Sequence, residues 1–367
     1  MGAVDLTNAV VGAVVGMLAA ALFQQPLQDA VFSLRKRASR TLHALRAEER
    51  SVPVWNTFSL GPLHTSGLIV EGDGTTPIAP ESVFVQVLDD EVRLPDEMAR
   101  WRDEIEEDNH RRRAAGDTST WNGDRYAVEA VSVSRSALDE NPEVHIRLRP
   151  TDYYTYLAAQ QLDRPLASGG TPRSRYLDPD RPLEAPAFLQ CSLGANVAVV
   201  TADDLLVVTR RSTETRMAPG LWNVSVNEGL SRHIDSAGRR APDLHALARR
   251  GMQEEMALEP HEYELTLLAV ALDVQKRHWG LHFYAKLSTL TGSALEARIS
   301  RGVADRWEHS TVDFVRFRPA DVTRYVLRPD RVHRWAPLAP SLFHLALVHV
   351  HSRTPVERAE AQVIRRL

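Results

Sequence analysis

The N-terminal part of the chain contains a long stretch without charge. Asp5 and Asp29 are the nearest charged residues on either side, and residues 9–23 are apolar throughout. Roughly 20 helical residues cross the hydrocarbon core of a bilayer. We therefore expect residues 1–30 to form a transmembrane helix. The alternative is a buried or amphipathic helix of a soluble protein, because the stretch is rich in weakly hydrophobic alanine.

The basic residues near this stretch all follow it, whereas a cleaved signal peptide has them in front. They are Arg35, Lys36, Arg37, Arg40 and Arg46. If the stretch inserts, the positive-inside rule predicts a single-pass protein of the cell membrane whose folded domains are cytoplasmic. If it does not insert, we expect a cytoplasmic protein. Gly12 and Gly16 would let two such helices approach closely, so a homodimer is possible.

Charge and cysteine content exclude several classes of protein. The 367 residues carry 44 basic and 48 acidic side chains, a formal net charge of −4, so no overall attraction to nucleic acid is expected. The single cysteine, Cys191, cannot form an internal disulfide and is expected to be a buried structural thiol.

The pattern of apolar residues predicts an α/β (α+β) protein of several parts. Strand-like runs surround a charged helix near residues 97–115, and a second set of strands surrounds a helix at residues 243–258. A Ser-, Gly- and Pro-rich stretch separates the two sets. The expected parts are 1–30, the transmembrane helix; 31–53, a basic juxtamembrane helix; 54–165, an α+β module; 166–187, a linker; 188–330, the main domain; and 331–367, a helical tail.

The chemistry is concentrated in the helix at residues 243–258 and the glycine-bearing loop before it. Arg250 precedes the paired carboxylates Glu254 and Glu255, and Gly229 opens the loop. Carboxylate oxygens are hard ligands that suit Mg²⁺ or Mn²⁺, and such an ion offsets negative charge as a phosphoanhydride breaks.

This stretch resembles the Nudix box, whose pattern is G-x5-E-x7-R-E-U-x-E-E-x-G-U with U a bulky aliphatic residue. Two positions depart from the pattern: Gly251 replaces its first helical glutamate and Ala257 replaces its last glycine. The loop is also longer than in the pattern. Asp235 follows Gly229 by six residues, the spacing of the earlier box glutamate.

The flanking segments strengthen the resemblance. Residues 200–212 and 218–222 look like the strand, hairpin and A-P-G-L turn that precede the box, and residues 307–315 resemble the element that follows it. The resemblance implies a Nudix α/β/α sandwich over residues 188–330.

A narrower resemblance is to the Nudix proteins that hydrolyse UDP-glucose and UDP-galactose. It rests on Thr201-Ala-Asp-Asp204, the long loop in the box, Trp121-Asn-Gly123 and the run 146–153. The implied partner is a nucleoside diphosphate-linked small molecule. The implied reaction is Mg²⁺-dependent attack of water on the diphosphate of a nucleotide sugar, giving a nucleoside monophosphate and a sugar 1-phosphate.

The resemblance also implies roles for individual side chains. Glu254, Glu255 and Glu308 would be metal ligands, with Glu255 and Glu308 catalytic, while Arg250 would organise the site from behind the ligands. Substrate-binding candidates are Arg210 and Arg211 for phosphate, Trp222 for a base unless it is a core residue, and Asn227 and Glu228. Asn227 or Glu228 would replace the carboxylate missing at Gly251.

Gly251 leaves three hypotheses open. The first is a membrane-anchored Nudix hydrolase, and the second is a catalytically impaired Nudix-fold protein that binds or senses a nucleotide. The third is a scaffold in which the fold is vestigial. Turnover supports the first, and ligand-induced stabilisation without product supports the second, because binding to the native state raises apparent stability.

Overall fold

The computed structural model describes residues 57–117, 119–213, 218–303 and 309–367. No helix in these ranges is long and apolar enough to span a bilayer. The expected transmembrane helix at 1–30 and juxtamembrane helix at 31–53 lie outside the described residues. Residues Trp55–Leu367 form one compact unit.

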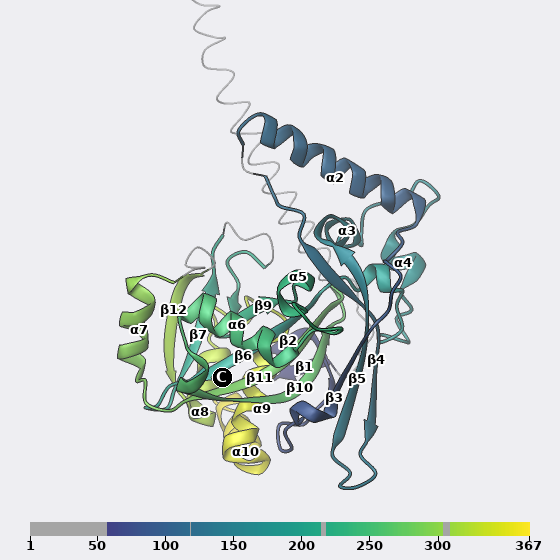
Figure 1. The fold of residues 1–367 in the computed structure, drawn as a ribbon. Coiled ribbons are helices and arrows are strands. Elements are labelled where there is room, and N and C mark those ends of the chain that lie inside the picture. The colour runs from purple at the N-terminus through teal and green to yellow at the C-terminus, as the bar shows by residue number, and fades with distance from the viewer. Residues whose placement is uncertain (1–56, 118, 214–217, 304–308) are drawn as a thin grey trace, which may run out of the picture. The chain divides into compact units, whose positions relative to one another are not determined.

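A large mixed sheet runs through the middle of this unit (Figure 1). Its strand order is β1-β2-β10-β11-β6-β7-β12, with β8 paired to β7 and β9 paired to β6. The strands are β1 (Thr57–Leu60), β2 (Leu63–Glu71), β6 (Leu193–Val200), β7 (Leu205–Arg211), β8 (Trp222–Asn223), β9 (Val226–Gly229), β10 (Tyr263–Asp273), β11 (His278–Leu287) and β12 (His309–Arg316). Strands β6 and β11 are parallel, so the sheet is not a simple meander.

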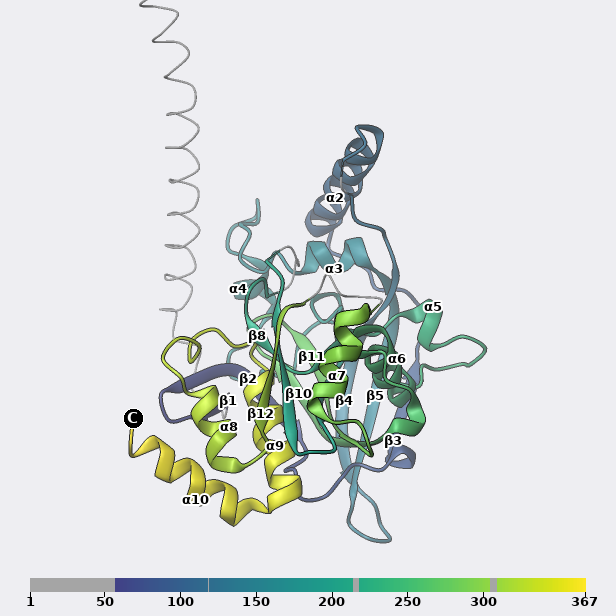
Figure 2. The same cartoon turned by 90° about the vertical axis from the view of Figure 1, so that its left-hand side faces the viewer.

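Helices cover both faces of the large sheet (Figure 2). Because successive side chains of a strand point to opposite faces, Val197 and Val199 enter the core under α6 and α7, while Ala198 and Val200 enter the core under the C-terminal helices. The helices are α5 (Arg232–Asp235), α6 (Leu244–Met256) and α7 (Gly292–Arg301) on the first side, and α8 (Pro319–Val326), α9 (Ala339–His351) and α10 (Arg353–Ile364) on the second. The architecture is a sheet between two helical layers.

Helix α6 begins where its sequence predicts and ends two residues before the predicted end at residue 258. The Asp243 carboxylate accepts hydrogen bonds from the backbone N–H groups of His245 and Ala246 and caps the helix. One side of the helix is buried against the sheet through Leu244, Leu247, Ala248 and Met252. Ala257 adopts a left-handed conformation with φ 52° at the C-terminal cap, the place where the Nudix pattern has glycine.

A smaller sheet of order β3-β5-β4 lies beside the large one (Figure 1). It consists of β3 (Val83–Val87), β4 (Asp124–Arg135) and β5 (Pro142–Asp152), and is accompanied by α2 (Asp96–Ala114), α3 (Tyr153–Ala159) and α4 (Pro172–Tyr176). Short 3-10 turns occur at Pro80–Ser82, Ala187–Leu189 and Pro260–Glu262. One face of the small sheet contributes Val128, Ile146 and Leu148 to the core that lies under α6. The two sheets therefore share a hydrophobic core.

The mixed α/β fold expected from the sequence is confirmed in these residues, and the helices expected near 97–115 and at 243–258 are found as α2 and α6, within two residues of those bounds. Two placements were not foreseen. Strands β1 and β2 fall in the expected module 54–165 yet belong to the large sheet, and α4 lies in the expected linker. The domain boundaries themselves stay a prediction. Cys191 is buried as expected, and its burial raises the pKa of the thiol to about 12.

Candidate functional site

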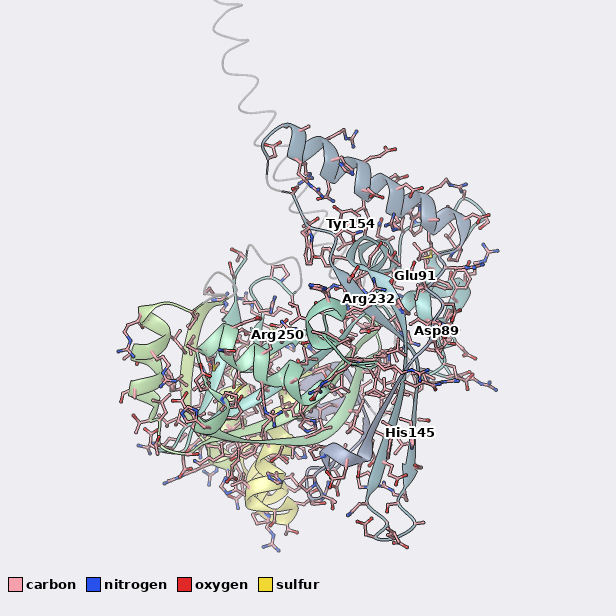
Figure 3. The ribbon with its side chains drawn as sticks, in the orientation of Figure 1. Asp89, Glu91, His145, Tyr154, Arg232 and Arg250 are labelled. Atoms are coloured by element: carbon pink, nitrogen blue, oxygen red, sulfur yellow. The ribbon has the colours of Figure 1, made fainter. Side chains whose placement is uncertain are left out.

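Arg250 is the centre of a polar cluster between α6 and β9 (Figure 3). Its guanidinium donates to both carboxylate oxygens of Asp235, at 3.1 and 3.0 Å, and to the carbonyl oxygen of Gly229 at 3.0 Å. It also pairs with Glu254, one turn further along the helix, and with Glu228 on β9, each at 3.0 Å. Arg250 therefore ties the opening of the loop to the helix that carries the paired glutamates.

The side chain of Glu228 occupies the space beside Gly251. A Cβ atom built on Gly251 would lie 2.6 Å from the Cβ of Glu228 and 2.9 Å from Cγ1 of Val226. Real Cβ atoms essentially never approach other atoms so closely. The position that carries the first helical glutamate in the Nudix pattern thus has no room for a side chain, because the aliphatic part of the Glu228 side chain on the neighbouring strand fills it.

The electrostatic environment of Glu228 favours its neutral form. Burial, together with repulsion from Glu255 and Glu254, outweighs the attraction of Arg250 and raises the pKa of Glu228 to about 8. Burial disfavours the charge of Arg250, but the hydrogen bond to Asp235 and the negative charges of Glu228, Asp235 and Glu254 outweigh it and raise the pKa of Arg250. The cluster therefore gathers several carboxyl groups around a single guanidinium.

Glu255 is the most deeply buried carboxylate of the site, with 2% of its surface exposed. Its Oε1 accepts a hydrogen bond of 2.9 Å from the backbone N–H of Asn227. The side chain of Asn227 points elsewhere and donates to Oδ1 of Asn196 on β6 at 2.8 Å. Asn227 thus holds Glu255 through its backbone, and of the two candidates for the missing carboxylate only Glu228 lies beside Gly251.

The other candidates from the sequence come from different elements. Arg210 donates to the carbonyl of Gly220 at 3.1 Å, and Arg211 is buried at the end of β7. Trp222 is 7% exposed and packs against Trp335 in the core under the C-terminal helices. Among the described residues, no hydrogen bond or ion pair joins Arg210 or Trp222 to the cluster around Arg250. Glu308 lies outside the described residues.

The donor set of the site fits a divalent cation only in part. Glu228, Glu254 and Glu255 all offer hard oxygen atoms, but the first two pair with Arg250 and the third binds a backbone N–H. Within the described ranges, no three His, Cys, Asp or Glu side chains are arranged to hold a metal ion. The described residues therefore do not by themselves supply a complete metal site.

Sequence reasoning missed the contribution of the small sheet. Arg125 on β4 lies against the first box residue, with its Nη1 3.3 Å from where a Cβ on Gly229 would stand. Asn196 was also missed. No spacing in the sequence connects residue 125 with residue 229. Only Asp124 separates Arg125 from the Trp-Asn-Gly motif at residues 121–123.

Comparison with known proteins adds one informative similarity. The chain is 29% identical over 167 residues to uridine diphosphate glucose pyrophosphatase NUDT22 of Mus musculus, and the match covers 42% of this chain and 52% of the mouse protein. The chain thus matches about half the length of that relative. No family model matches the chain.

Two solved structures are similar over the same share of this chain, 42%. The first is DR0079 from Deinococcus radiodurans, with 14% sequence identity, a TM-score of 0.31 and coverage of 42% of this chain and 82% of that chain. The second is the MutT NUDIX hydrolase from Burkholderia pseudomallei, with 13% sequence identity, a TM-score of 0.28 and coverage of 42% of this chain and 96% of that chain. TM-scores of this size carry no argument. The box helix, its flanking segments and the similarity to the mouse protein support a resemblance of this chain to the Nudix superfamily and, within it, to the UDP-glucose pyrophosphatase.

Proposed function

We propose that this protein hydrolyses the diphosphate of a nucleoside diphosphate derivative, with a UDP-sugar as the first candidate. Water attacks one phosphorus atom, the bridging P–O bond breaks, and a nucleoside monophosphate and a sugar 1-phosphate leave. Nudix hydrolases generally use divalent metals, so Mg²⁺ or Mn²⁺ is the expected cofactor. Such an ion neutralises phosphate charge when bound.

The observation that carries this proposal is the cluster around Arg250. The departure at Gly251 would remove a carboxylate from the box, but Glu228 lies in that space and pairs with the same arginine as Glu254. Asp235 completes the cluster at the position that the box spacing assigns to a glutamate. The chain's own residues can therefore keep the loop and helix in place, as a site for a diphosphate requires.

The test is product release by the full-length protein from UDP-glucose, UDP-galactose and other nucleoside diphosphate derivatives. We expect the nucleoside monophosphate and the sugar 1-phosphate to appear in equal amounts with Mg²⁺ or Mn²⁺, and to fall to background when EDTA removes the metal. Absence of both products from every substrate, with either ion, would contradict the proposal.

A second candidate is a protein of the same fold that binds a nucleotide without turnover. It is favoured by the loss of the box glutamate at Gly251 and by the incomplete donor set among the described carboxylates. The same samples distinguish the two candidates. A nucleotide that raises the unfolding temperature yet yields no product would support binding alone.

We further propose that the uncharged stretch before Asp29 anchors the protein in the cell membrane with its folded part in the cytoplasm. The proposal is supported by the length of the stretch and by the basic residues after it. Cell fractionation of the full-length protein and of a chain that starts at residue 31 tests it. We expect only the longer protein in the membrane fraction, and recovery of both in the soluble fraction would refute the anchor.

A further inference from the structure

Arg125 approaches the candidate site from the small sheet. It lies on β4, and its Nη1 and Nη2 atoms are 3.3 and 3.9 Å from where a Cβ on Gly229 would stand. Gly229 is also the residue whose carbonyl accepts a hydrogen bond from Arg250. The absence of a side chain at Gly229 therefore leaves room for a second guanidinium at the start of the box.

Two tyrosine rings of α3 hold this guanidinium. The Cζ atom of Arg125 is 4.8 Å from the centre of the Tyr153 ring and 5.3 Å from that of Tyr156. The two rings are themselves stacked at 5.6 Å. A cation over an aromatic face is attracted to the ring electrons without being neutralised. The contact thus fixes the position of Arg125 and leaves its charge available.

The carboxylates close to Arg125 in the fold are already paired with other arginines. Asp124, the residue before Arg125, forms an ion pair with Arg232 on α5 at 3.0 Å. Asp152, which lies opposite Asp124 on β5, forms an ion pair with Arg102 at 2.6 Å. Figure 3 labels Arg232, which also joins the box loop to the small sheet. In the part of the chain that the structure describes, Arg125 makes no hydrogen bond or ion pair of its own.

The surroundings of Tyr156 place a second cation near this point. Burial raises the pKa of the Tyr156 hydroxyl, and both Arg125 and Arg211 act against that rise. Arg211 comes from the end of β7 in the large sheet, whereas Arg125 comes from the small sheet. Cations of the two sheets therefore both act on Tyr156, against which Arg125 lies.

We propose that Arg125 binds a phosphate group of the nucleoside diphosphate beside Gly229, as an anion-binding residue contributed from outside the Nudix box. The proposal rests on the proposed function for its ligand class. A guanidinium suits this task because it can donate two parallel hydrogen bonds to phosphate oxygens. The half-buried, unpaired charge gains a partner when the anion binds, so the affinity for the ligand should depend on its phosphates.

The test compares the binding of UDP and of uridine by calorimetry, with Mg²⁺ present, for the full-length protein and three variants. Arg125→Met keeps an unbranched side chain between the tyrosines but removes the charge. Arg125→Lys keeps the charge but not the planar donor pair. Arg147→Met is the matched control, because Arg147 is an exposed arginine on β5 of the same sheet.

We expect Arg125→Met to weaken UDP binding by about 10- to 100-fold and uridine binding by less than about twofold, the size of a lost charge-assisted hydrogen bond. Arg125→Lys should fall between Arg125→Met and wild type, and Arg147→Met should match wild type. The proposal is overturned if Arg125→Met keeps its UDP affinity within about twofold, if uridine binding falls as much as UDP binding, or if wild type binds UDP no better than uridine.

Two additions keep the outcome decisive. If Arg125→Met does not fold, Arg125→Lys decides: a larger loss for UDP than for uridine supports the proposal, and equal losses overturn it. Release of sugar 1-phosphate from UDP-glucose is measured on the same preparations. Binding without turnover would then defeat the proposed hydrolysis while still testing Arg125.

Discussion

Replacing Glu255 by glutamine is expected to lower kcat by about 10²- to 10⁴-fold and to leave the protein folded, the range associated with losing a catalytic acid or base. Glu255 is 2% exposed, and its Oε1 accepts the backbone N–H of Asn227. The amide oxygen of glutamine can accept the same hydrogen bond in the same volume. The substitution therefore removes the negative charge and keeps this hydrogen bond.

The matched control is Glu296→Gln on α7, the helix beside α6, because Glu296 is an exposed glutamate. We expect it to keep wild-type kcat. Steady-state release of sugar 1-phosphate measures both variants, and thermal unfolding shows that each is folded. An active Glu255→Gln variant with kcat within about threefold of wild type would remove Glu255 from the catalytic residues.

Gly251→Glu, which restores the residue of the Nudix pattern, is expected to destabilise the protein by about 3 kcal/mol or more. Overpacking a filled site typically costs about 1–3 kcal/mol, and a further buried carboxylate beside Glu228 adds to that cost. The clash involves the Cβ of Glu228, 2.6 Å away, and this atom cannot move without the β9 backbone. The midpoint of chemical unfolding measures the loss.

The reciprocal exchange Glu228→Gly/Gly251→Glu is the corresponding rescue. It removes the clashing Cβ and leaves one carboxylate in the same space, so we expect it to recover at least half of the stability that Gly251→Glu loses. Glu228→Gly alone serves as the control for the added flexibility of the strand. If Gly251→Glu is as stable as wild type, the side chain of Glu228 does not fill the space at 251.

Local patterns predict most of the individual elements of this fold. Alternating apolar residues give the strands, and the Asp243 cap gives the start of α6. The partners of those strands are not local properties. Nothing in residues 57–71 indicates pairing with β10, and nothing in β5 indicates that Ile146 enters the core of the larger sheet. Such contacts depend on chain segments that are far apart in sequence.

The site divides in the same way. The six-residue spacing from Gly229 to Asp235 and the organising role expected of Arg250 point to residues that the structure brings into one cluster. The sequence also offered Asn227 and Glu228 as substitutes for the missing carboxylate, but only the geometry at Gly251 separates them. The sequence did not decide whether Trp222 contacts a base or belongs to the core, because its packing partner Trp335 lies over a hundred residues later in the chain. Arg125 could not be predicted from the sequence for the same reason, because it meets Gly229 only in the folded structure.

The pairing of β2 with β10 has a consequence for how the protein is made. The Ser66 hydroxyl donates to the Asp273 carboxylate across 207 residues of sequence. At about 5–20 residues per second, β2 leaves the ribosome roughly 10–40 seconds before the strand that will cover its open edge. During that interval the β1–β2 hairpin presents unpaired backbone groups, which other strands can pair with. The nascent chain therefore presents an open strand edge until β10 has been synthesised.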